Sequence, residues 1–355
     1  MLQMGKLGYE FVVVTSPGEA LGKFREECPQ FKTIEVPMER HISLMKDMAA
    51  LLKMIGVMAR EKPYVVHSMT PKAGLLTMVS AWLTGVPIRI HTFTGLVWPT
   101  AVGGKRKLLK LTDKLLCACA THIIPEGQGV LNDLKNGGIT KKQMKVLGYG
   151  NVRGVDMKRF NPARFCQTQT VDKLFTFVFV GRIVGDKGVN ELVAAFIRLH
   201  EIDNRIRLVL VGSYEQNLDP VSDITRQYID DNDAINACGA KYGDDLLQMY
   251  VDADCFVMPS YREGFPNTVL EAGAMGLPSI VTDTNGSREV IIDGENGLIV
   301  PSKDVDALFL AMERMLTDDA ARQYMARNAR KLIASRFEKD FVQNCQIAFY
   351  KEIGV

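Results

Sequence analysis

Glycines and basic residues directly follow an apolar segment near the middle of the 355-residue chain. Residues 174–180 read LFTFVFV, and the next eight read GRIVGDKG. Glycines let the backbone approach an anion, while Arg182 offers a planar fork of donors and Lys187 a point charge. The pattern indicates a pyrophosphate-binding turn between a strand and a helix, with a purely structural turn as the alternative. It matches neither the GxxxxGK[ST] phosphate loop nor the GxGxxG dinucleotide motif.

A second segment carries two glutamates that suit hydroxyl groups. Residues 259–272 read PSYREGFPNTVLEA and also follow an apolar run. Pro266 and Asn267 predict the start of a helix, with Asn267 as its N-cap and free backbone N–H groups for a phosphate. Glu263 precedes this helix and Glu271 lies about one turn inside it, so both can accept hydrogen bonds from one ligand's hydroxyls. The alternative for each is a capping or solvent-facing side chain.

Alternating strands and helices must position these segments. Apolar runs that predict strands are separated by stretches with helical periodicity. Repeated strand–helix units predict an α/β protein with parallel sheets, helices on both faces, and ligands at the carboxyl ends of the strands. The expected strands are 11–15, 64–67, 88–92, 122–124, 174–180, 206–211, 255–258 and 279–282, and the expected helices are 43–60, 72–83, 105–119, 189–200, 244–251, 268–275, 304–316 and 320–335.

The length of the chain predicts two domains, at ~100–200 residues each. Residues 151–173 have no strong period, and we place the linker there. We expect an N-terminal domain over 1–160, a C-terminal domain over 161–335, and a helix over 336–355 that packs back on the N-terminal domain. Both domains are expected to be doubly wound, with the ligand site in the cleft between them.

Charge is divided unequally along the chain. The net charge is +2, but residues 1–165 carry +12 and residues 166–355 carry −10. The densest basic patch predicts contact with anionic lipid headgroups or a phosphorylated acceptor, and a solvated helix face is the alternative. This patch consists of Lys105, Arg106, Lys107, Lys110 and Lys114. No aromatic-interleaved basic motif or zinc-finger spacing supports a nucleic-acid partner.

Several patterns that the sequence lacks bear on where the protein is located in the cell and on whether it needs a cofactor. The chain has no uncharged run of 18 apolar residues that would predict a membrane span, and its N-terminus has no signal-peptide pattern. The seven cysteines are scattered, and we expect all to be reduced. We therefore expect a cytoplasmic protein that can associate peripherally with the inner face of the cell membrane. Asp252-x-Asp254 mimics a DxD metal motif, but we expect it to be structural, and we expect neither a metal nor a cofactor.

Glu263-x7-Glu271, inside EGFPNTVLEAGAMGLP, resembles the signature of the retaining glycosyltransferases of family 4, which have the GT-B fold. Arg182 and Lys187 match the basic pair of that family. Further matches are HSMTPKAG at 67–74, GVD and RF within 154–160, and DGENG at 293–297, so the resemblance runs from about residue 9 to about residue 340. The TPKAG segment is similar to bacterial enzymes that assemble capsule, O-antigen or exopolysaccharide repeat units.

The resemblance implies a role for each residue on the donor side. Arg182 and Lys187 would hold the donor diphosphate and neutralise it as it leaves. Glu271 would bind the ribose hydroxyls, and Glu263 the transferred sugar near its 3- and 4-hydroxyls. Main-chain groups would surround the sugar and phosphates at Gly181, Gly264, Phe265, Pro266, Asn267 and Thr268, with Pro266 offering only its carbonyl.

Two features depart from the family pattern. Many relatives carry a His-Gly pair after the strand that ends here near His91, whereas this chain has Thr94 and Gly95 at that place. We keep all three as acceptor-side candidates, with a packed strand-end histidine as the alternative for His91. At the N-terminus, residues 11–15 match the family's second strand and residues 1–8 the end of its first helix. We therefore expect the first strand and its acceptor-side loop to be missing, through truncation of a longer gene product or through rearrangement.

These observations predict a retaining, metal-independent glycosyltransferase. The expected reaction moves a sugar from a nucleotide-sugar, with UDP-sugar as the expected donor, to a lipid-linked saccharide in surface polysaccharide biosynthesis. One alternative is a non-catalytic nucleotide-sugar-binding protein, motivated by Thr94 and the missing N-terminal elements. Another is a GT-B sugar-nucleotide epimerase, which would need acid/base carboxylates and a histidine in the cleft. A dehydrogenase is disfavoured because GxGxxG is absent.

Overall fold

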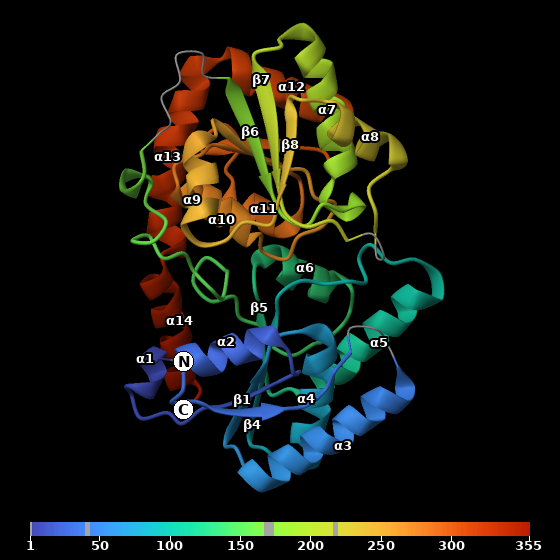
Figure 1. The fold of residues 1–355 in the computed structure, drawn as a ribbon. Helices are drawn as coiled ribbons and strands as arrows, with labels where there is room; N and C mark the ends of the chain where they lie inside the picture. The colour runs from blue at the N-terminus through green and yellow to red at the C-terminus, as the bar shows by residue number, and fades with distance from the viewer. Residues whose placement is uncertain (1, 40–42, 167–173, 216–218) are drawn as a thin grey trace. The chain divides into compact units, whose positions relative to one another are not determined.

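The chain divides into two compact units, shown in a computed structural model that describes residues 2–39, 43–166, 174–215 and 219–355 (Figure 1). Unit 1 comprises Met1–Glu126, Val130–Val146 and Ile347–Val355, and unit 2 comprises Gly127–Gly129 and Leu147–Gln346. Residues 147–160, which the sequence placed in the N-terminal domain, fall in unit 2 because Val155 and Phe160 pack in its core. Residues 167–173 of the predicted linker lie outside the described residues.

Unit 2 is built on a six-stranded parallel sheet with the strand order β11-β10-β9-β6-β7-β8. The order reverses between β6 and β9, because β7 and β8 extend the sheet to one side and β10 and β11 to the other. Such a switch point is where doubly wound sheets bind ligands, outside the carboxyl ends of the strands. The strands are β6 (Phe175–Val180), β7 (Ile206–Val211), β8 (Ile235–Gly239), β9 (Cys255–Met258), β10 (Ser279–Thr282) and β11 (Gly297–Val300).

Helices cover both faces of this sheet, as the alternation of apolar side chains along β6 requires. Phe177 and Phe179 belong to one core with α7 (Val189–Ile202) and α12 (Val305–Thr317). Val178 and Val180 belong to the other core. That core also contains residues of α9 (Gly243–Asp252), α10 (Asn267–Ala274) and the end of α13 (Asp319–Phe337). The other α-helices are α8 (Asp223–Asp231), α11 (Asn285–Val290) and α14 (Lys339–Glu352), and two short 3-10 helices lie at Pro162–Arg164 and Gly185–Lys187.

Unit 1 contains two separate parallel sheets, β1-β2 and β3-β4-β5. Among the described residues no strand precedes β1, which follows the short helix α1, and β1 and β3 do not pair with each other. The last residues of α14 also belong to this unit. The elements are α1 (Leu2–Gly5), β1 (Val12–Thr15), α2 (Glu19–Glu27), β2 (Lys32–Glu35), α3 (Leu44–Glu61), β3 (Val65–Ser68), α4 (Pro71–Leu83), β4 (Ile88–Phe93), α5 (Gly103–Cys119), β5 (His122–Pro125) and α6 (Gln128–Asn136).

Two histidines form a polar network inside unit 1. His67 on β3 is bonded through Nε2 to the Thr92 hydroxyl at 2.7 Å and through Nδ1 to the Tyr350 hydroxyl of α14 at 2.7 Å. The fully buried His91 shares a 2.8 Å hydrogen bond between its Nδ1 and the Ser68 hydroxyl. Burial lowers the pKa of His67 to about 4 and, together with the charge of His67, that of His91 to about 3. Both rings are therefore neutral in the folded chain at pH 7.

This network predicts that the fold loses stability as the pH falls below about 6.5, the pKa of an unfolded histidine. The unfolded chain then binds protons that the folded chain cannot bind until about pH 4, so protonation favours unfolding. We expect the free energy of unfolding, from urea titrations, to drop by about 1–3 kcal/mol between pH 7.5 and 5.5. The drop should be smaller in His67→Gln. An equal drop in that variant would show that His67 does not cause it.

Candidate functional site

The four predicted donor-side residues come from the ends of two adjacent strands of unit 2. Arg182 and Lys187 follow β6, Glu263 follows β9, and Glu271 lies in α10, which begins a few residues further on. Because β6 and β9 pair in parallel at the switch point of the sheet, their carboxyl ends lie at the same edge. The fold therefore brings both sequence segments to one place.

Gly188 allows the turn after β6 to pack against the end of β9. Its φ of 71° lies in the left-handed region, and a Cβ atom there would stand 2.0 Å from the Pro259 carbonyl oxygen. No side chain fits that gap, so the glycine is required by backbone packing. The prediction from the sequence was that the glycines of this turn let an anion approach. The packing of Gly188 against Pro259 is a further, structural reason for a glycine at this position.

Lys187 and Glu263 form an ion pair at this edge. Lys187 Nζ lies 2.5 Å from Glu263 Oε1, and the two side chains are only 18% and 12% exposed. A cation and a carboxylate this close and this shielded interact much more strongly than a surface pair does. Lys187, predicted to hold a phosphate, and Glu263, predicted to hold sugar hydroxyls, thus face the same small volume.

Arg182 lies in a more open position and pairs with a carboxylate that the sequence did not single out. Its Nη1 is 2.7 Å from Oε2 of Glu215, in the segment after β7. The guanidinium keeps further donors that this single contact does not use. An anion that is more highly charged than a carboxylate can therefore compete with Glu215 for Arg182.

Glu271 is almost buried and faces a small cavity. Its side chain is 11% exposed, and Oε1 lies 3.5 Å from Nη1 of Arg153. Burial raises the pKa of Glu271, while the charges of Arg153 and Arg159 and a contact with Tyr250 oppose that rise. The cavity measures about 130 Å³ and is lined by Arg153, Gly154, Val155, Asp156, Arg159, Phe160, Asn267, Glu271 and Lys339. A carboxylate in such a place suits a neutral donor such as a hydroxyl group.

The start of α10 differs from the prediction for Asn267. The helix begins at Asn267 itself, Pro266 is the N-cap, and among the described residues no side chain caps it. Asn267 Oδ1 instead accepts a 3.2 Å hydrogen bond from Nδ2 of Asn151, so its assignment as N-cap was wrong. Phe265 turns its ring into the core against Phe337, which leaves its main chain for any ligand contact.

The acceptor-side candidates lie in unit 1 and differ in exposure. His91 is fully buried on β4. Its ring packs directly against Gly74 of α4, where an added Cβ would lie only 2.4 Å from His91 Cε1. It presents no atom to an acceptor in this structure, which agrees with the packed-histidine alternative. Thr94 is partly exposed, and its hydroxyl donates a long 3.3 Å hydrogen bond to the Met69 carbonyl. Gly95 follows it with a φ of 144°.

The Asp252-x-Asp254 motif makes local hydrogen bonds. Asp254 Oδ2 accepts a 2.9 Å hydrogen bond from the Thr176 backbone N–H, and Asp252 Oδ1 accepts a 3.0 Å bond from Gln248. The first hydrogen bond connects the beginning of β6 to the turn before β9. It therefore lies at the amino ends of these strands, whereas Lys187 lies at their carboxyl ends. In the part of the chain that the structure describes, no three His, Cys, Asp or Glu side chains are grouped to hold a metal ion.

Three residues that bear on this site were not found in the sequence. Glu215 pairs with Arg182, and Arg153 pairs with Glu271. Gly286 lets α11 approach the loop that contains Gly264, because a Cβ on Gly286 would lie 2.2 Å from the Gly264 carbonyl oxygen. Each acts through a contact between segments far apart in the sequence. A weak local signal existed only for Arg153, which directly precedes the GVD motif.

Known proteins with similar sequences are glycosyltransferases. Residues 163–332 match the model of "Glycosyl transferases group 1", and residues 2–150 match that of the "Glycosyl transferase 4-like domain". The capsular polysaccharide biosynthesis glycosyltransferase CapM of Staphylococcus aureus is 32% identical over 93% of this chain and 86% of its own length. An Escherichia coli UDP-Gal:alpha-D-GlcNAc-diphosphoundecaprenol alpha-1,3-galactosyltransferase is 31% identical over 84% of this chain and 78% of its own.

A solved structure with a similar fold is Anabaena Alr3699/HepE in complex with UDP and glucose. It superposes with a TM-score of 0.80, 17% identity, and coverage of 96% of this chain and 91% of the Anabaena chain. This likeness shows the GT-B fold, in agreement with the two units of parallel sheet and helix. Taken with the matches in sequence, the fold and the residues at the switch point identify the chain as a member of the family 4 glycosyltransferases, of the type that builds capsule and O-antigen.

Proposed function

We propose that this glycosyltransferase moves a sugar from a UDP-sugar to a lipid-linked saccharide, with retention of the anomeric configuration and without a metal ion. The observation that carries the proposal is the meeting of Arg182, Lys187 and Glu263 at one edge of the unit 2 sheet, with Glu271 in the adjoining helix. Two cations and two shielded carboxylates match the parts of a nucleotide-sugar, which are a diphosphate and two sets of hydroxyl groups.

Each of these side chains has a partner that the donor would replace. Lys187 and Arg182 would exchange the carboxylates of Glu263 and Glu215 for phosphate oxygens. Glu263, once freed from Lys187, would accept hydrogen bonds from the sugar hydroxyls. Glu271 would accept them from the ribose in place of its long contact with Arg153.

In the proposed reaction, negative charge develops on the diphosphate as it leaves the sugar. The bond between the anomeric carbon and the β-phosphate oxygen breaks, and a bond to the acceptor hydroxyl oxygen forms on the same face of the sugar. The acceptor proton passes to the departing phosphate oxygen, so no separate base is needed. Arg182 and Lys187 stabilise the extra charge on the leaving diphosphate, and two such preorganised cations supply the charge that a metal ion supplies in other enzymes.

The identity of donor and acceptor is supported by the relatives. The E. coli relative is named for a UDP-sugar donor and a diphosphoundecaprenol-linked acceptor, and the Anabaena structure contains UDP. A transfer assay with UDP-sugars and an undecaprenyl-diphosphate sugar tests the proposal, with the product's anomeric configuration read by NMR. An inverted product or activity abolished by EDTA would contradict the retaining or the metal-independent part, respectively.

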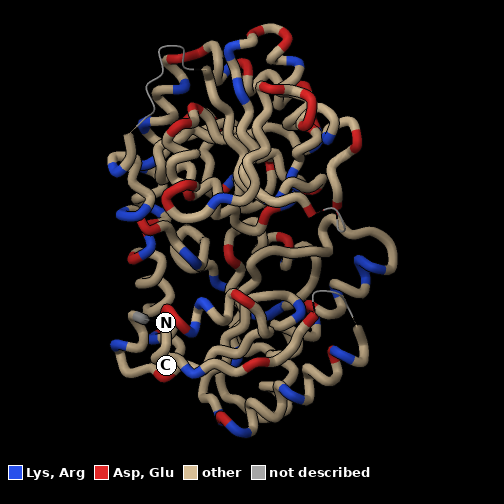
Figure 2. Tube along the Cα trace, viewed as in Figure 1, with Lys and Arg blue, Asp and Glu red and all other residues tan. Residues whose placement is uncertain are grey.

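The surface of α5 supports a peripheral membrane association in the same function. No described helix combines the length and apolar character that a membrane span requires. On α5, however, Leu108, Leu111 and Leu115 are about half exposed or more at helical spacing, among exposed lysines. Figure 2 shows how basic residues gather along this helix. Exposed leucines beside lysines are typical of helices that lie in an anionic lipid interface.

Removal of the exposed lysines of α5 is expected to weaken binding to anionic vesicles. Arg106 and Lys110 lie 5.9 and 5.1 Å from the ring centroid of the buried Trp98, so they also stabilise the fold and are left unchanged. The variant Lys105→Gln/Lys107→Gln/Lys114→Gln should lose about 1 kcal/mol of binding per charge at most, with a smaller loss at high salt. Arg327→Gln/Lys331→Gln on α13 is the control. Equal vesicle co-sedimentation of all three proteins would assign the α5 lysines to a solvated face.

A further inference from the structure

Tyr250 on α9 is a buried tyrosine whose hydroxyl has no hydrogen-bond partner among the described residues. Its side chain is 0% exposed and lies in a core of unit 2, with its ring centroid 6.1 Å from that of Phe256. A buried hydroxyl without a partner costs about 1–3 kcal/mol of folding free energy. A phenylalanine would fill the same space without that cost, so packing alone does not account for the hydroxyl.

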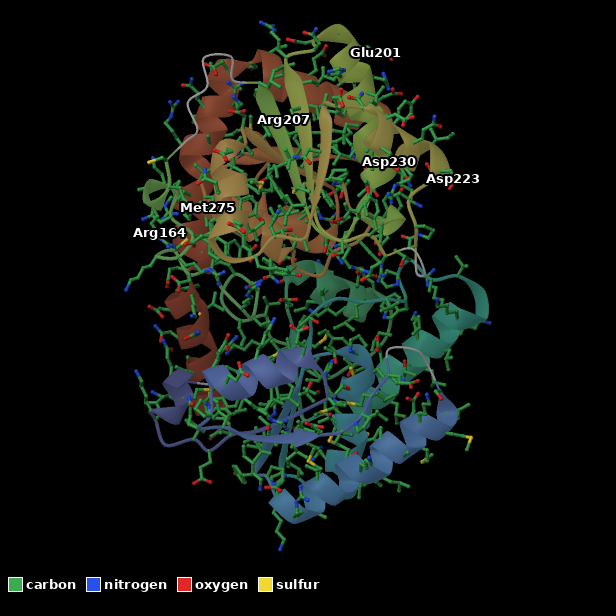
Figure 3. The ribbon with its side chains drawn as sticks, viewed as in Figure 1. Arg164, Glu201, Arg207, Asp223, Asp230 and Met275 are labelled. Carbon is green, nitrogen blue, oxygen red and sulfur yellow. The ribbon has the colours of Figure 1, made fainter. Side chains whose placement is uncertain are left out.

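The nearby acceptor is the Glu271 carboxylate. Tyr250 lines the same cavity as Met275, which lies one helical turn after Glu271 and so on the same side of α10. Burial raises the pKa of Tyr250 far above its ordinary value, and the charge of Glu271 adds to that rise. Glu271 lies in α10, and its carbonyl accepts a 3.0 Å hydrogen bond from the backbone N–H of Met275 at the end of this helix. Figure 3 labels Met275 and so marks where α10 ends. The main chain that carries Glu271 is therefore fixed, and only its side-chain torsions remain to be set.

Glu271 and Arg153 border the small cavity of about 130 Å³, and Tyr250 does not. The contact to Arg153, at 3.5 Å and with an arginine side chain that is 59% exposed, is too long and too open to fix the carboxylate. An ionised carboxylate has about four acceptor positions, so it can accept from Tyr250 on one side and from two ligand hydroxyls on the other.

We propose that Tyr250 is a positioning residue that donates its hydroxyl hydrogen to Glu271 and so aims this carboxylate at the two ribose hydroxyls of the donor nucleotide. The inference rests on the proposed function, because it takes the ribose as the ligand of Glu271. The same hydrogen bond favours the ionised carboxylate, which burial disfavours. The other charged groups around Glu271 are Arg153, Arg159, Asp156 and Lys339.

The test is the variant Tyr250→Phe, with calorimetric binding of UDP and of 2′,3′-dideoxy-UDP. We expect UDP to bind about 10-fold more weakly, which corresponds to about 1.4 kcal/mol. The dideoxy analogue, which lacks both hydroxyls, should bind the variant within about twofold of its wild-type affinity, on the same free-energy scale. As the pH is lowered, UDP affinity should also fall at a higher pH in the variant than in the wild type, because Glu271 loses a hydrogen bond to its charged form.

Two controls separate this role from a structural one. Tyr214→Phe removes another unpartnered buried hydroxyl of unit 2, beneath Arg226, and should leave both affinities unchanged. On a Glu271→Ala background, Tyr250→Phe should cause no further loss of UDP affinity. The melting temperature of ligand-free Tyr250→Phe should stay close to that of the wild type, because phenylalanine fills the same space in the core.

Unchanged UDP affinity in Tyr250→Phe, or an equal loss for UDP and its dideoxy analogue, would overturn the role of Tyr250 and leave the proposed function intact. If the wild-type protein binds GDP or ADP in place of UDP, the same comparison is made with that nucleotide and its dideoxy form, because the ribose is common to all three. Failure of the wild type to bind any of them would overturn the proposed donor site and the role of Tyr250 with it.

Discussion

Replacing Lys187 by alanine is expected to reduce sugar transfer by roughly 10²–10³-fold, as loss of one preorganised electrostatic stabiliser typically does. Lys187 lies in a shielded position beside Glu263, where its charge acts through little water. The effect should appear mainly in kcat, since the charge on the diphosphate grows as it leaves. Arg182→Ala should be similar, and the double variant should lose less than the sum because both side chains act on one leaving group.

The ion pair dictates the controls for this measurement. Lys187→Ala leaves the Glu263 carboxylate without its cation, so part of the loss could come from that uncompensated charge. The variant Lys187→Ala/Glu263→Gln removes both charges. If it regained near-native transfer, Lys187 would be a counter-ion of Glu263 and not a diphosphate ligand. Lys331→Ala on α13 controls for loss of a positive charge elsewhere in unit 2 and should transfer normally.

Replacing the two glutamates by alanine is expected to separate binding from transfer. Glu271→Ala should weaken free UDP by roughly 10–100-fold, the range for losing hydrogen bonds to a charged group. It should weaken the UDP-sugar equally, because both carry the ribose. Glu263→Ala should leave UDP affinity within about threefold, or improve it, because Lys187 is released for the phosphates, while transfer falls about 10²-fold.

Calorimetry with UDP and the UDP-sugar, together with single-turnover transfer, checks this separation. Glu289→Ala in α11 serves as a comparison, since Glu289 accepts hydrogen bonds from the backbone N–H groups of Gln128 and Gly129 and lies outside the proposed donor contacts. UDP binding lost in Glu263→Ala and retained in Glu271→Ala would show that the two roles are exchanged.

Most of the fold could be predicted from the sequence. Three strands were missed, and two of them, β2 and β8, share a physical reason, which does not apply to the largely buried β11 (GLIV). β2 and β8 lie at the edges of their sheets and have mixed burial along their length. An edge strand is covered on fewer sides, so its residues KTIE and INACG show little of the apolar pattern that marks a central strand such as β6. The helices that were missed, α2, α6, α8 and α11, have at most nine residues each, too short for a clear period.

The family, the alternation of strands and helices, and the choice of Arg182, Lys187, Glu263 and Glu271 as site residues could be predicted from residues close together in the chain. The partners of these four side chains could not, because they come from distant segments that only the folded chain brings together. Lys187 meets Glu263, Arg182 meets Glu215 and Glu271 meets Arg153 because the order of the strands in unit 2 brings distant loops to one edge. Strand order is set by the packing of whole faces of helix and sheet, and no local spacing encodes it.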